Sequence, residues 1–208
     1  MAGPVRLTRK LFAETFILAV VVFSAGFPRC VGAQETAVVL DPQNTKITFL
    51  LRATLHTVHG TFVLKRGEVR FDSSTGEATG SITLDATSAQ TGNSSRDRTM
   101  HAEILESQKF PEIVFTAKRV KGLVASEGNS QVEVSGTFRL HGRDHEMTVP
   151  VSIDRGADGR FQADAHFAVP YVQWGLKNPS TFVLRVSDVV ELEVHAEGKT
   201  SEATRPSP

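Results

Sequence analysis

Alternation of apolar and polar side chains dominates the chain after Thr36. From Val190 to Glu197, for example, every apolar residue is followed by an acidic residue or a histidine. A period of two is typical of a β-strand with one face in a core and the other in water. The same pattern predicts strands over residues 46–53, 81–86, 113–117, 132–140, 146–153, 161–167 and 190–197, with shorter strands over 57–64, 68–71 and 181–186.

One segment departs from this pattern. Residues 94–106 have helical spacing, with Asn93 or Ser94 as the N-terminal cap. Pro111 follows shortly afterwards and disfavours helix at the residue before it. The other connections are rich in Gly, Asp, Ser and Asn, as in the turns of antiparallel hairpins. We therefore predict an all-β protein with a single short helix.

Residues 1–33 have the features of a secretory signal peptide. Arg6, Arg9 and Lys10 precede an apolar stretch over 16–27, which is shorter than the about 20 residues that a membrane-spanning helix needs. Small residues before Gln34 predict cleavage after Ala33, and cleavage would leave no stable membrane anchor. The single cysteine, Cys30, lies in this leader, so the exported chain has no disulfide.

The rest of the chain has the length of one ordinary domain. We assign that domain to residues 34–198 and predict that the polar, proline-containing residues 199–208 are disordered. The net charge is zero. A nucleic-acid partner is not expected, because it would favour a basic patch.

Strands with one apolar face must cover each other, since one short helix cannot cover them all. A sandwich and a barrel both satisfy this requirement. A barrel also removes the exposed sheet edges, which benefits an exported chain without disulfides. We predict an antiparallel β-barrel of about eight strands, whose interior has room for side chains or for one small ligand.

The predicted inward positions mix large and small residues. Small residues in the middle of strands, such as Ala117, Gly136, Ala163 and Ala165, leave volume that either closes by packing or holds an apolar guest. The pattern leaves both outcomes open. The candidate ligand-binding residues of this interior and its rim are Phe49, Leu51, Ala53, Phe115, Phe138, Met147, Ala163, Ala165, Phe167 and Trp174.

Three motifs occur in order along residues 38–198. Leu40-Asp41-Pro42 precedes Lys46-Ile47-Thr48-Phe49, Asn93-Ser94-Ser95-Arg96-Asp97-Arg98 leads to His101 and then Lys109-Phe110-Pro111, and Gly136-Thr137-Phe138-Arg139-Leu140 forms a later hairpin. Together they resemble the YceI-like family of bacterial periplasmic lipid- or polyisoprenoid-binding proteins. The resemblance implies a lipocalin-like antiparallel barrel with a helix near one end, and a long isoprenoid or acyl chain as its guest.

Arg96, Asp97, Arg98 and His101 form the densest polar cluster. Arg96 and His101 could bind a phosphate or quinone head group at the barrel mouth, because arginine presents two parallel donors to such oxygens. In the alternative reading, Asp97 and the arginines pair with each other and attach the helix to the rim. Trp174, with Tyr171, either lines the rim or plugs one end as core.

Catalytic and metal sites are not predicted. His56 and His59, like His141 and His145, lack further ligands at metal-binding spacing. No nucleophile elbow, zinc-protease motif or phosphate loop occurs, and the alternation places almost no ionisable group inward.

These observations predict a periplasmic carrier or storage protein, without enzymatic activity or cofactor. It would hold a long apolar lipid: a polyisoprenoid, an isoprenoid quinone or a fatty-acyl chain. The alternative is a ligand-free envelope-stress or interaction protein whose barrel is filled by side chains and encloses no apolar tunnel. The oligomeric state stays open, a homodimer included.

Overall fold

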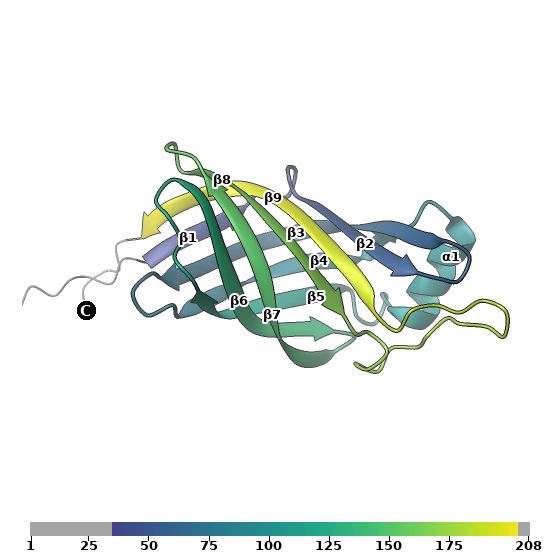
Figure 1. Cartoon of the computed structure of the whole chain (residues 1–208). Helices are drawn as coiled ribbons and strands as arrows, with labels where there is room; N and C mark the ends of the chain where they lie inside the picture. Colours follow the sequence, from purple (N-terminus) through teal and green to yellow (C-terminus); the bar gives the residue numbers. More distant parts are fainter. Residues whose placement is uncertain (1–34, 204–208) are drawn as a thin grey trace, which may run out of the picture. The chain divides into compact units, whose positions relative to one another are not determined.

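The computed structural model describes residues 35–203, and the predicted signal peptide lies outside this range. Within it, nine antiparallel strands surround a common interior, and one helical segment lies beside them (Figure 1). The helix α1 (Ser94–Thr99) continues directly into η1, a π-helical stretch over Met100–Ile104. The strands are β1 (Glu35–Leu40), β2 (Lys46–Arg52), β3 (Thr57–Asp72), β4 (Ala78–Gln90), β5 (Glu112–Lys121), β6 (Gly128–Leu140), β7 (Arg143–Arg155), β8 (Arg160–Val169) and β9 (Val190–Ala203).

The nine strands occupy eight positions around a closed barrel. β1 and β2 lie one after the other in the same gap, since each pairs with β3 on one side and β9 on the other. Asp41 makes the turn between them, where its carboxylate accepts hydrogen bonds from the Gln43 amide and the Asn44 side chain. Every other strand pairs with its sequence neighbour, and the ring is closed where β9 pairs with β1 and β2. The structure confirms the predicted barrel.

Alternation along the strands sets which side chains face the interior. On β9, Leu192 and Ala196 are buried, while Glu193 and His195 are exposed. Two clusters of buried side chains result. One includes Phe49 and Phe138, and the other is built around Phe71 with Ala78, Ala117, Val120 and Val132.

The helix begins where the sequence predicts. The Asn93 side chain accepts hydrogen bonds from the backbone amides of Ser95 and Arg96, which satisfies two of the free amides of the first turn. The helical stretch ends at Ile104, close to the predicted end at residue 106.

Three predicted boundaries are wrong. Residues 57–64 and 68–71 belong to one strand, because a register shift between Leu64 and Arg66 lets β3 continue past Gly67. Residues 181–186 form a loop that has only one bridge, between Ala53 and Val186, and no neighbouring strand to pair with. Residues 199–203, predicted as disordered, extend β9, because β1 supplies backbone partners as far as Ala203 whatever the side chains are. Residues 204–208 lie outside the described range.

Candidate functional site

The interior of the barrel contains an apolar, partly open cavity of about 180 Å³. Strands from the whole circumference contribute to its wall, and three threonines are its uncharged polar members. Asp164 contributes to the wall, but its carboxylate bonds His195 Nδ1 at 2.7 Å and both side chains are largely exposed. The wall includes Phe115, Phe138, Val151, Ile153, Phe167 and Leu192. Such a chamber suits a hydrocarbon chain far better than a polar molecule.

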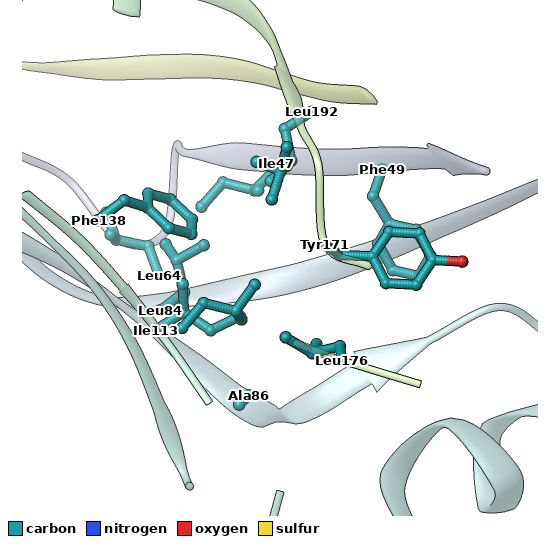
Figure 2. Close-up of a cluster of buried hydrophobic side chains, with 12 residues drawn as sticks. Ile47, Phe49, Leu64, Leu84, Ala86, Ile113, Phe138, Tyr171, Leu176 and Leu192 are labelled. Carbon is teal, nitrogen blue, oxygen red and sulfur yellow. The ribbon is translucent and has the colours of Figure 1, made fainter. Parts of the chain in front are cut away.

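A loop closes one end of this cavity. The connection between β8 and β9 turns inward and places Tyr171 and Leu176, each 5% exposed, in the same cluster as Phe49 and Phe138 (Figure 2). We call Tyr171, Trp174 and Leu176 the plug. The Tyr171 hydroxyl donates a hydrogen bond to the Ser187 carbonyl at 2.8 Å. Burial, and to a lesser extent Asp188, raises the pKa of Tyr171 to about 12, so the phenol stays protonated.

Trp174 lies against His145 of β7. The two rings are parallel within 3° and their centroids are 4.2 Å apart, while the Phe138 ring lies 5.6 Å from Trp174. Burial, reinforced by the nearby Arg143, lowers the pKa of His145, so a neutral imidazole stacks on the indole. Of the two roles considered for Trp174, the structure places it in the plug.

The polar cluster of the helix is bonded to the chain that leads into it. Asp97 Oδ1 accepts hydrogen bonds from the Thr91 amide at 2.9 Å and from the Thr91 hydroxyl at 2.5 Å. Arg96 Nε donates to that hydroxyl at 2.8 Å, and an Arg96 Nη donates to the Thr91 carbonyl at 3.0 Å. The cluster therefore anchors the helix, although through Thr91 rather than through pairing of Asp97 with the arginines.

His101 takes part in the same anchoring. Its Nε2 lies 2.8 Å from the carbonyl of Ala89 on β4, and its Nδ1 lies 2.9 Å from the hydroxyl of the buried Ser107. Because a carbonyl only accepts, Nε2 carries a proton. Both ring nitrogens are thus satisfied within the protein, and neither Arg96 nor His101 belongs to the cavity wall.

The candidate residues from the sequence fall into three groups. Phe115, Phe138, Ala163, Ala165 and Phe167 line the cavity together. Phe49, Leu51, Met147 and Trp174 pack in or against the cluster around the plug. Ala53 lies at the rim, bridged to Val186, while Arg96 and His101 anchor the helix as described.

The sequence prediction missed a charged residue of the wall. Arg155, the last residue of β7, lines the cavity at the end away from the plug, and its buried Nε has no hydrogen-bond partner. Extending the alternation Met147, Val149, Val151, Ile153 by two residues leads to it. The sequence prediction stopped that strand at 153, where the apolar residues end.

Residues 35–203 hold no cluster of metal ligands and no helix that could span a membrane. No three side chains of His, Cys, Asp or Glu gather closely enough there to hold a metal ion. None of the helices in this range has the length and hydropathy needed to cross a bilayer.

The relatives found by comparison with known proteins agree with one another. A model of the YceI-like domain matches residues 39–198. A UPF0312 protein of Pseudomonas putida is 28% identical over 153 residues, which cover 68% of this chain and 73% of the relative. A UPF0312 protein of Vibrio parahaemolyticus is 21% identical over 172 residues, 80% of this chain and 89% of the relative.

Two solved structures share the fold. BcnA of Burkholderia cenocepacia has a TM-score of 0.62 and 15% identity, covering 76% of this chain and 98% of its own. A polyisoprenoid binding domain from Saccharophagus degradans has a TM-score of 0.58 and 16% identity, covering 79% of this chain and 98% of its own.

Proposed function

Because this chain belongs to the YceI-like domain family, we propose that its barrel binds one apolar lipid chain of the polyisoprenoid class. The observation that carries the proposal is the cavity in the barrel interior, with its almost wholly hydrocarbon wall. The name of the Saccharophagus degradans relative, a polyisoprenoid binding domain, supports the choice of ligand class. Affinity would come from apolar area removed from water, at about 25 cal/mol per Å².

The cavity volume sets a condition on this function. Ligand pockets commonly measure about 300–1,000 Å³, and an engineered cavity of about 150 Å³ holds one benzene molecule. At about 180 Å³ the present cavity accepts part of a long chain. A whole chain therefore requires half-buried wall side chains, such as Phe115 and Phe167, to change rotamer or the plug to shift. An apolar cavity inside the barrel nevertheless disfavours the alternative of a barrel filled by side chains.

The remaining parts of the proposal rest on the sequence. The leader over residues 1–33 supports export and a periplasmic carrier or storage role. We propose no catalytic step, since the charged side chain aimed into the described cavity is an arginine, which stays protonated and is not a general base.

Filling the cavity tests the proposal. Ala165, on β8, faces the interior of the barrel, and Ala168 on the same strand is exposed. Ala165→Phe should abolish uptake of a polyprenyl alcohol by the delipidated mature protein, whereas Ala168→Phe should leave uptake unchanged. Native mass spectrometry measures the bound lipid, and circular dichroism verifies the fold. Equal uptake by a folded Ala165→Phe variant would show that the lipid lies elsewhere.

A further inference from the structure

Arg155 is unusual for a wall of this kind. It lies at an inward position of β7, opposite Phe161 of β8, and its Nε is shielded from solvent. Its side chain makes no hydrogen bond or ion pair with any other residue that the structure describes. A polar N–H that is shielded from water and has no partner is costly, so Nε calls for an acceptor oxygen, which a ligand could supply.

Nearby carboxylates do not provide that oxygen. Asp158, in the hairpin that follows β7, bonds Arg160, whose side chain is 73% exposed. Asp164 bonds His195 on the outer face. Both acids are thus engaged outside the cavity.

The cavity runs from Arg155 toward the plug. Ile153, Val151 and Val149 follow Arg155 on the same face of β7 and line the cavity in turn. At about 3.3 Å per residue, the distance from Arg155 to Val149 is about 20 Å along the strand. One end of this path is charged and the rest is apolar, as in an amphiphile with a single polar terminus.

We propose that Arg155 binds the oxyanion, a carboxylate or a phosphate, at the end of an apolar chain that extends toward the plug. The proposal rests on the proposed lipid-binding function and adds the chemistry and orientation of the ligand. Guanidinium nitrogens donate two parallel hydrogen bonds to two oxygens of such a group. An alcohol of the same chain length offers one uncharged oxygen, so its contact with Arg155 adds much less to the binding affinity.

Three ligands with the same chain test the inference: farnesoic acid, farnesyl phosphate and farnesol. Their affinities for the delipidated mature protein are measured by calorimetry, with Trp174 fluorescence as a second signal. We expect the acid, the phosphate or both to bind at least about tenfold more tightly than farnesol, as expected for a charge-assisted hydrogen bond. Arg155→Gln should remove this preference and leave the farnesol affinity unchanged. Arg160→Gln, in the same hairpin but outside the cavity, should keep the preference.

The outcomes distinguish the proposed role of Arg155 from the proposed lipid-binding function on which it rests. Equal affinities of the wild type for all three ligands, or a preference that survives in Arg155→Gln, would overturn the role of Arg155 and leave lipid binding intact. Failure of the wild type to bind any of them would overturn the proposed function itself. A preference for the acid alone or the phosphate alone identifies which oxyanion is recognised. If Arg155→Gln does not fold, Arg155→Lys takes its place: it keeps the charge but loses the two parallel donors, so the preference should weaken, and an unchanged preference would overturn the role of Arg155.

Discussion

Gly136 and Ala165 both lie at inward positions, yet they border very different spaces. A Cβ atom added to Gly136 would lie 2.2 Å from the Thr116 carbonyl oxygen and 2.9 Å from the Phe115 ring. Ala165 borders the cavity. Of the two outcomes that the sequence leaves open for small inward residues, Gly136 shows closure by packing, because neighbouring backbone and ring atoms already occupy that space.

This contrast predicts the effect of one methyl group. Gly136→Ala should lower the free energy of unfolding by about 1–3 kcal/mol, since the obstructing carbonyl belongs to the backbone of the paired strand β5. Urea denaturation measures the change. Gly156→Ala is the control, because the tightest contact of its added Cβ, at 3.0 Å, would be with the Asp158 side chain, and the Arg160 carbonyl oxygen lies at an ordinary 3.7 Å in an exposed turn. A loss no larger than that of the control would refute the packing described at Gly136.

At the scale of elements, the position of helix α1 depends on its hydrogen bonds to Thr91 more than on any contact with a ligand. The Thr91 hydroxyl donates to Asp97 and accepts from Arg96, so a single side chain serves both charged groups. Sequence could identify this cluster by its density of charge. It could not identify the partner, because threonines are common along the chain and only the fold brings Thr91 to the cluster.

Thr91→Val should therefore destabilise the protein by about 1–3 kcal/mol, because Asp97 and Arg96 each lose a hydrogen bond. The affinity for farnesol should stay within about twofold of wild type, since Thr91 is absent from the cavity wall. Thermal unfolding and calorimetry measure the two effects. Thr148→Val on β7 serves as the matched control, with its hydroxyl bonded only to Ser135 on the exposed face. A large loss of lipid affinity with unchanged stability would instead support the head-group reading of this cluster.

For the whole molecule, surface carboxylates make stability depend on pH. A hydrogen bond from the Thr87 hydroxyl is the main cause that lowers the pKa of Asp85, and Lys65 and Lys118 are the main causes for Glu112 and Glu146. Groups with a folded pKa below the unfolded value of about 4 stabilise the fold above that pH, and their contribution is lost as the pH falls through the folded pKa. We expect the barrel to weaken progressively below about pH 4.

Asp85→Asn tests one part of this dependence. The variant should be less stable than wild type at pH 7, and the difference should shrink toward pH 3, where the wild-type carboxyl begins to protonate. Urea midpoints at pH 7, 5 and 3 give the comparison, with Glu127→Gln in an exposed turn as control. A difference that stays constant across this range would contradict the assigned cause.

The barrel was predictable because alternation is a local property that each strand displays by itself. Some inward residues pack against a neighbour and others border the cavity. The strand register and the plug decide between these outcomes, and the spacing of Ala163 or Gly136 in the sequence reveals neither the register nor the plug. The strand β1 was missed for a related reason. It is short, and its place is set by pairing with β9, at the far end of the sequence.

That pairing has a consequence for how the chain reaches its native state. Glu35 faces Ala203 and Leu40 faces Gly198, so the first and last strands form part of the seam that closes the ring. A chain delivered from its N-terminus onward would present open edges on β1 and β2 until β9 arrives. Contacts so distant in sequence make folding slow, because the loop must close before they form. We therefore expect the ring to close only once β9 has been made, and the open edges of β1 and β2 to be exposed to aggregation in that interval.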